Sequence, residues 1–282
     1  MRYDPALTMR NKDAAEIRLL AGAAGLLAAA VLADSAIEHY RGSFRNPAMF
    51  VALGTSSLGL GASVDGARRR PGLSSDARRL LFGAATTTGA IGTGFHIYNL
   101  LRRPGRLGWR DFFYGAPIGA PAALILSGLS GLAAESLRSG QTGGMPQFFG
   151  LPAGRTLAGL AALGLCGTVA EAALLHFRGS YQNPFMLLPV SLPPVAAGLL
   201  ARVALRPGRG RQTAARQWLR LTALLGLIGP LFHSYGVHRA MGGWRNWRQN
   251  VLNGPPLPAP PGFTGLAMVG LAALRLIERR GA

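Results

Sequence analysis

The chain has 282 residues and a formal net charge of +19, yet only 15% of its residues are charged and 49% are hydrophobic. A soluble domain carries about 25% charged residues, so these few charges cannot cover a globular surface and we expect an all-α integral membrane protein. A disulfide-stabilised fold is excluded because Cys166 is the only cysteine, and the long apolar runs exclude intrinsic disorder.

Eight windows of the sequence have the length and apolar character that a membrane-spanning helix needs, about 20 residues each. In chain order we expect them near residues 17–39, 47–64, 80–101, 116–137, 156–176, 184–205, 218–238 and 262–277. Short connections rich in arginine, glycine and proline separate these windows and cannot continue a helix. The first sixteen residues contain three acidic side chains and do not resemble a cleaved signal peptide.

Basic residues are distributed unequally between the two sides of such a membrane protein. With eight spans, the side that carries both termini holds 20 basic residues and the opposite side holds 10. Because the side with more basic residues stays in the cytoplasm, we predict a bacterial inner-membrane protein with both termini cytoplasmic. This arrangement explains the high positive charge without nucleic acid as a partner.

The sequence also contains an internal repeat. Residues 39–50 return as residues 176–187, with seven of twelve positions identical at an offset of 137, and residues 95–98 return as 232–235. We therefore predict a cytoplasmic segment 1–16, a four-helix repeat 17–138, a linker 139–154 and a second four-helix repeat 155–278. Because each repeat has an even number of spans, the two should be parallel and related by a pseudo-twofold axis along the membrane normal.

Histidine is the most informative residue type in the repeat. Four of the five histidines form two matched pairs, His39 with His176 and His96 with His233, and His238 has no counterpart. All four lie near the ends of odd-numbered spans, at the predicted non-cytoplasmic side. Ionisable residues inside a membrane are usually functional, and imidazole nitrogens are axial ligands of haem iron.

These histidines predict two b-type haem sites, one ligated by His39 and His96 and the other by His176 and His233. Pairing across the repeats, His39 with His233 and His176 with His96, is equally compatible with the sequence. A single non-haem metal bound by all four histidines is another alternative, since imidazole also suits zinc, copper and iron. A further alternative is that no cofactor is bound.

Small and basic residues near the histidines suggest how a haem could be held. Arg41 and Arg178 follow the first pair by two residues and could bind haem carboxylates, although anchoring at lipid headgroups explains them equally well. Glycines precede the second pair by seven and four residues and could leave a groove for a flat macrocycle, whereas the alternative is close helix packing. These glycines are Gly89, Gly92, Gly226 and Gly229.

Two further matched pairs are candidates for proton transfer or quinone binding. Asp34 and Glu171 each lie five residues before a histidine, about 140° away around the helix, so they do not share its face. Tyr98 and Tyr235 follow the second histidine pair by two residues. The acids could carry protons or bind a quinone headgroup, or they could be structural carboxyls bonded to neighbouring hydroxyl or backbone groups.

Three functions follow from this pattern. The first is a non-catalytic, cytochrome b-like electron-transfer subunit that passes electrons between an extracytoplasmic oxidoreductase and quinone. The second is a transporter or channel that uses Asp34 and Glu171, and the third is a cofactor-free membrane anchor or scaffold. The sequence has no motif for covalent haem attachment, nucleotide binding or a nucleophilic serine.

Overall fold

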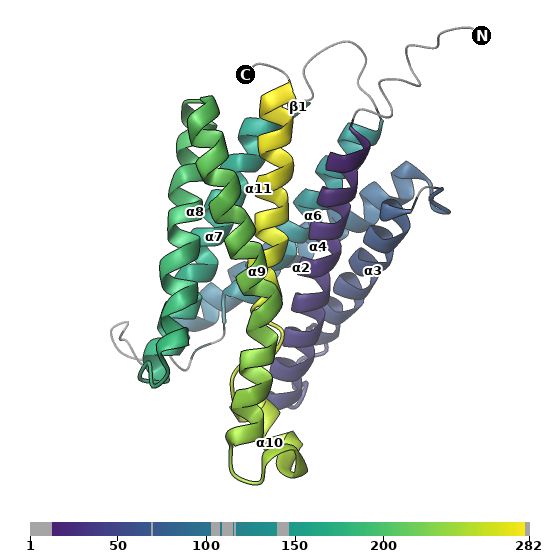
Figure 1. Cartoon of the computed structure of the whole chain (residues 1–282). Coiled ribbons are helices and arrows are strands. Elements are labelled where there is room, and N and C mark those ends of the chain that lie inside the picture. The colour runs from purple at the N-terminus through teal and green to yellow at the C-terminus, as the bar shows by residue number, and fades with distance from the viewer. Residues whose placement is uncertain are drawn as a thin grey trace, which may run out of the picture.

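The computed structural model describes residues 13–68, 70–102, 108, 115, 117–139 and 147–279. These residues form a bundle of long helices, as the all-α prediction requires (Figure 1). Residues 1–12 of the expected N-terminal segment and 140–146 of the expected linker lie outside the described part of the chain.

The helices of the first half are α2 (Ala14–Arg41), α3 (Met49–Ala67), α4 (Ser75–Leu101) and α6 (Gly119–Arg138). Those of the second half are α7 (Ala153–Arg178), α8 (Leu188–Leu205), α9 (Arg209–Arg239) and α11 (Pro261–Arg279). Shorter elements connect them: η1 (Pro184–Leu187), η2 (Gly243–Asn246) and α10 (Trp247–Asn253).

Five segments are long and apolar enough to cross a membrane. They are α2, α6, α7, the continuous η1–α8 segment Pro184–Leu205, and α11. The chain is therefore a multi-pass membrane protein in contact with the lipid bilayer. Large apolar side chains such as Phe95 on α4 and Leu231 on α9 are more than half exposed, as expected of side chains that face lipid.

Each of the eight windows expected from the sequence overlaps a helical segment, but two helices begin five or more residues earlier than predicted. Helix α4 begins at Ser75 instead of residue 80, and α9 begins at Arg209 instead of residue 218. Polar residues with good helix propensity extend both helices beyond their apolar parts. The start of α4 is also stabilised by Ser74, whose hydroxyl accepts the N–H of Ala77 at 3.1 Å.

The helices of each half are packed in a closed ring. In the first half α2 packs on α3, α3 on α4, α4 on α6 and α6 on α2. In the second half α7 packs on α8, α8 on α9, α9 on α11 and α11 on α7. Consequently α2 and α4 lie diagonally across one ring, and α7 and α9 lie diagonally across the other.

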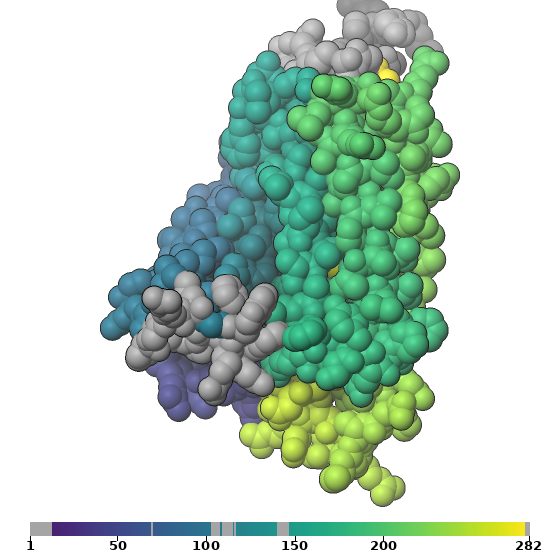
Figure 2. Space-filling view, turned by 90° about the vertical axis from the view of Figure 1, so that its left-hand side faces the viewer, coloured from purple at the N-terminus to yellow at the C-terminus, as the bar shows by residue number. Residues whose placement is uncertain are grey.

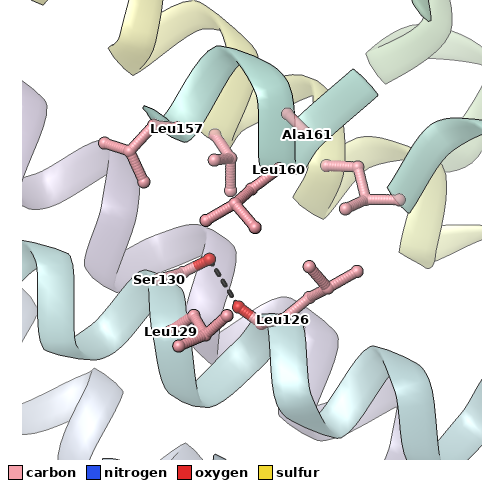
Figure 3. Close-up of a pocket in the computed structure, with 8 residues that line it drawn as sticks. Leu126, Leu129, Ser130, Leu157, Leu160 and Ala161 are labelled. Atoms are coloured by element: carbon pink, nitrogen blue, oxygen red, sulfur yellow. Dashed lines mark hydrogen bonds between the residues drawn. The ribbon is translucent and has the colours of Figure 1, made fainter. Parts of the chain in front are cut away.

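Helix α11 joins the two halves. It packs along α2 of the first half as well as on α7 and α9 of its own half, and 13 of its 19 residues are buried. The space-filling view shows α7 and α8 side by side, with the yellow-green segment that contains α10 projecting beyond them (Figure 2). Leucines from α6, α7 and α11 close the seam between the halves around a void of only about 10 Å³ (Figure 3).

The bundle has two distinct ends. The beginning of α2 and the end of α11 lie at one end, here called the terminal end, and α10 lies at the other (Figure 1). Helices α2, α4, α7 and α9 finish at the same end as α10, so the four matched histidines are located there. This second end is called the histidine end below.

The expected linker 139–154 contains a short hairpin that the sequence did not suggest. Strands β1 (Gln147–Phe148) and β2 (Leu151–Pro152) pair antiparallel across a turn in which Phe149 and Gly150 have φ of 55° and 73°. Phe148 is only 5% exposed and packs into the main core. The hairpin therefore anchors the connection between the two halves.

A buried network of charges ties three helices of the first half together at the terminal end. Arg78 on α4 donates from Nε and Nη2 to the two carboxylate oxygens of Glu135 on α6, at 2.8 and 2.9 Å. Its Nη1 donates to Asp65 on α3 at 3.0 Å. Ser75 donates to Glu135 at 2.6 Å, and the backbone N–H groups of residues 72 and 73 donate to Asp65. The side chains of Arg78, Glu135 and Asp65 therefore each have hydrogen-bond partners as well as an opposite charge nearby.

The second half has no equivalent of this network. By the offsets of the sequence repeat, Arg78 corresponds to Ala215, Glu135 to Leu274 and Asp65 to Arg202. Ala215 and Leu274 are fully buried, whereas Arg202 is exposed. An apolar contact thus occupies the place of the ion network.

We predict that Arg78→Ala lowers the free energy of unfolding by about 3–5 kcal/mol, because it leaves two buried carboxylates without their cation. Thermal unfolding of the detergent-solubilised protein measures this effect. Asp76→Ala is the control, since it removes only an exposed pair with Arg79 at 3.3 Å and should cost less than about 1 kcal/mol. Equal losses in the two variants would contradict the assigned role of the network.

Candidate functional site

The sequence motif that follows His39 and His176 folds into the same unusual turn in both halves. After α2, Ser43 and Phe44 have φ of 57° and 45°, and after α7, Ser180 and Tyr181 have φ of 59° and 45°. In each turn the N–H of the aromatic residue donates to the backbone carbonyl of the histidine, at 3.0 and 3.1 Å. Two successive non-glycine residues in the left-handed region cost roughly 1–2 kcal/mol each. Strain of this kind concentrates at functional sites.

The left-handed turn brings each of these histidines against the beginning of the next helical segment. The Nδ1 atom of His39 lies 3.0 Å from the carbonyl oxygen of Met49, and that of His176 lies 2.8 Å from the carbonyl oxygen of Met186. The aromatic ring of the turn contacts the imidazole edge-on, with ring centroids 6.2 Å apart for Phe44 and 6.1 Å apart for Tyr181. Both rings are therefore held by a hydrogen bond and by an aromatic contact.

The second histidine pair makes the same type of bond on the other side of each ring of helices. His96 at the end of α4 is bonded through Nδ1 to the carbonyl of Pro117, just before α6. His233 on α9 is bonded through Nδ1 to the carbonyl of Pro256, just before α11, at 2.6 Å. Each of the four matched histidines thus connects the end of one helix with the start of the next.

These bonds determine which nitrogen of each ring carries a proton. A carbonyl oxygen can only accept a hydrogen bond, so Nδ1 must carry the proton in all four histidines. In a neutral imidazole this leaves Nε2 with a free lone pair. An Nδ1–H bonded to a backbone carbonyl is also the arrangement that orients metal-ligating histidines and makes Nε2 a better ligand.

Each half holds two of the four matched histidines. His39 lies within electrostatic range of His96, and His233 lies within electrostatic range of His176. Each pair comes from diagonally opposite helices, α2 with α4 and α7 with α9. The structure thus places the partners of the first pairing in the same ring of helices, and their shared ligation stays a prediction. All four side chains are half-buried, whereas His238 is exposed.

The four glycines near the second pair serve helix packing, which was the alternative to a macrocycle groove. A Cβ on Gly89 would lie 2.7 Å from the backbone of α6 at Pro121 and Ile125. A Cβ on Gly226 would lie 2.6 Å from the backbone nitrogen of Thr264 on α11. Gly92 faces Pro121 and Gly229 faces Pro260 in the same way. Helices α6 and α11 thus fill the grooves into which a flat ring was expected to fit.

The arginines and tyrosines near the histidines lie at the surface of the histidine end. Arg41 donates to Glu38 on its own helix at 2.6 Å, and Arg178 is the exposed last residue of α7. The guanidinium of Arg102 lies 5.3 Å from the ring centroid of Tyr98, and that of Arg239 lies 6.0 Å from the ring centroid of Tyr235. These matched cation–π contacts give the two tyrosines an interfacial position.

The two matched acids come from opposite halves of the molecule. Asp34 on α2 lies within electrostatic range of Glu171 on α7, and Glu38 influences both. The carboxylate of Glu171 accepts the backbone N–H of Gly119, the first residue of α6. A Cβ at position 119 would lie 1.6 Å from Oε2 of Glu171, so only glycine fits there. The first half thus supplies the binding partner of an acid in the second half.

Several groups at the site were not identified from the sequence. The carbonyls of Met49, Met186, Pro117 and Pro256 are backbone atoms, which a search for chemically active side chains does not detect. One signal was nevertheless present, since the spacing from histidine to methionine is ten residues in both copies. Among the described residues, histidine, cysteine, aspartate and glutamate form no group of three or more that could hold a metal ion.

Comparison with known proteins gives no relative on which this site could be mapped. No family model, no curated protein and no solved structure matches the chain.

We predict that relieving the left-handed turn stabilises the protein. Ser43→Gly should raise the free energy of unfolding by about 1 kcal/mol, because the Ser43 side chain is exposed and glycine adopts φ of 57° without strain. Thermal unfolding in detergent provides the measurement. Ser139→Gly is the control, since Ser139 has a φ of −69° and its replacement should stabilise nothing. A lower stability of Ser43→Gly would show that the turn is not strained.

Proposed function

We propose that the chain crosses a bacterial inner membrane eight times, as two parallel four-helix repeats with both termini in the cytoplasm. The identical order of helix contacts in the two halves supports this topology. The duplicated left-handed turns and duplicated histidine bonds support it independently. Under this topology, α3, α4 and α9 also span the bilayer, and the histidine end faces away from the cytoplasm, as the distribution of basic residues predicts.

We further propose that the protein is a membrane electron-transfer subunit in which each histidine pair ligates a b-type haem. The observation that carries this proposal is that all four rings are bonded through Nδ1 to backbone carbonyls, which leaves Nε2 as the ligating atom. The donor set therefore fits haem iron, which accepts two axial imidazoles. The glycines before His96 and His233 do not form a groove for haem, because α6 and α11 pack against them.

The chain's own residues would prepare the site in three ways. The carbonyls of residues 49, 117, 186 and 256 fix the tautomer of the four rings and increase their donor strength. Phe44 and Tyr181 restrict rotation of two of the rings through their edge-on contacts. The surrounding apolar helices lower the local dielectric constant. When bound, haem supplies a one-electron carrier, and we propose an extracytoplasmic oxidoreductase as the electron donor and quinone as the acceptor.

Two separate pairs are favoured over one shared metal centre. His39 and His96 belong to one ring of four helices, on α2 and α4, and His176 and His233 belong to the other ring, on α7 and α9. A single non-haem metal would require three or four such side chains together, and the described residues contain no such group. We therefore assign one ligand pair to each half of the molecule.

Absorption spectroscopy tests the haem proposal. Protein expressed with sufficient haem should show a Soret band that shifts on reduction with dithionite. His96→Ala should remove roughly half of the bound haem, since each half holds one group, and His96→Ala combined with His233→Ala should remove all of it. His238→Ala is the matched control and should leave the spectrum unchanged, because His238 is exposed and outside both pairs.

A colourless protein under these conditions would contradict the haem proposal. A Soret band that persists in the double variant would contradict the assigned ligands. Circular dichroism of each variant verifies that its helices have formed, so that loss of haem can be separated from loss of fold.

One observation favours a second function, proton or ion transport. Asp34 and Glu171 come from opposite halves and lie within electrostatic range of each other at the seam. Carboxyls in this position inside a membrane protein commonly mark a path for protons or cations. Such a path would use the two acids jointly and would not require the histidine pairs.

Flux measurements in proteoliposomes test this second function. If it is correct, Asp34→Asn and Glu171→Gln each reduce proton flux to the level of empty vesicles, because each removes one member of the pair. Glu278→Gln is the control, since Glu278 pairs with Arg216 away from the seam, and it should retain flux. Wild-type protein without flux above empty vesicles would eliminate transport of protons as the function.

A further inference from the structure

A groove of about 560 Å³ opens at the histidine end of the bundle. One wall is the end of α2 and its left-handed turn, with Tyr40, Arg41 and Phe44. The other wall is α10, with Arg248 and Leu252. Small-molecule sites in proteins have volumes of about 300–1,000 Å³, so this groove is large enough for a lipid headgroup with its adjoining apolar atoms.

The cations of the groove are held in defined positions. The Nη2 atom of Arg248 donates to the hydroxyl of Tyr40 at 2.6 Å, and its guanidinium lies 5.6 Å from the centroid of the Tyr40 ring. The Nη1 atom of Arg41 donates to Glu38 at 2.6 Å. A guanidinium has five N–H donors, so neither bond exhausts its arginine. The charges of Arg41, Arg248 and Glu38 together give a net charge of +1 beside the groove.

Apolar side chains form part of the groove, at the level where a membrane-spanning helix ends. Phe44 stacks on Phe50 with ring centroids 4.5 Å apart and an interplanar angle of 10°. Leu252 supplies an aliphatic surface on the opposite wall. Because α2 is a candidate membrane span that finishes at Arg41, the groove lies at the boundary between lipid chains and headgroups. Its ligand should therefore combine an anionic group with an apolar body.

We propose that this groove binds an acidic phospholipid of the leaflet at the histidine end, with the lipid phosphate between Arg41 and Arg248. Guanidinium groups bind phosphate oxygens in a bidentate manner. The hydroxyl of Ser43 and the amide of Asn253 also line the groove and can bond to the glycerol part of the headgroup. The site is independent of the histidine pairs, so it does not require a bound haem or a transport activity.

Native mass spectrometry of the full-length protein in detergent tests this site, with phosphatidylglycerol and phosphatidylcholine of equal chain length as probes. Wild-type protein should retain phosphatidylglycerol in preference to phosphatidylcholine. Arg248→Gln and Arg41→Gln should each reduce its retention about fivefold, since one arginine contributes about 1 kcal/mol to binding an acidic lipid. Arg239→Gln is the matched control, because it removes the same charge at the same end of the bundle but outside the groove. This variant should retain phosphatidylglycerol as well as the wild-type protein does.

Further arms of the experiment separate the outcomes. Tyr40→Phe keeps the ring but removes the hydroxyl that holds Arg248, and it should also weaken retention of phosphatidylglycerol. Excess inorganic phosphate should not displace the lipid, because phosphate has no apolar body to fill the groove. Displacement by phosphate, equal retention of the two lipids, or equal losses in Arg239→Gln and Arg248→Gln would each overturn the proposal.

Discussion

The hydrogen bond from an imidazole Nδ1 to a backbone carbonyl is the interaction on which the histidine end of this protein depends. Each of the four matched histidines donates to the carbonyl oxygen of a residue at or shortly before the start of the next helical segment. These bonds connect the ends of α2, α4, α7 and α9 to the segments that follow them. The same bond presents Nε2 for ligation, so one interaction accounts for both the stability of the chain reversals and the proposed chemistry.

The two halves are most alike at the histidine end and differ elsewhere. Both contain the left-handed turn, the aromatic contact and the asparagine whose side chain accepts an N–H two residues later, Asn46 in one half and Asn183 in the other. At the terminal end, by contrast, the ion network around Arg78 is replaced by an apolar contact at Ala215. The strained turn is thus present in both halves, whereas the buried ion network is present in only one.

The long helices could be predicted from the sequence because apolar runs of about 20 residues have one dominant physical meaning. The histidines could be singled out because the repeat places them in matched positions. Their bonding partners could not, since Pro117 and Pro256 contribute carbonyl oxygens, which every residue possesses. The role of Gly89 and Gly226 was ambiguous for a different reason: a glycine groove accommodates a flat ligand or a helix equally well, and only the positions of α6 and α11 distinguish the two. The helix α10 and the groove beside it depend on contacts between segments about 200 residues apart in sequence, such as the 208-residue separation between Tyr40 and Arg248.

Solid-state ¹⁵N nuclear magnetic resonance of the histidine-labelled protein in bilayers examines the central interaction directly, because the chemical shifts of the two ring nitrogens differ with the position of the proton. In protein prepared without metal or haem, at a pH at which free imidazole is neutral, we predict that the single ring proton of each of the four matched histidines lies on Nδ1 and that Nε2 is unprotonated. Replacing His96 and His233 should remove two of these four signals and leave those of His39 and His176. Rings that are protonated at Nε2 alone would contradict the carbonyl bonds and, with them, the proposed ligation.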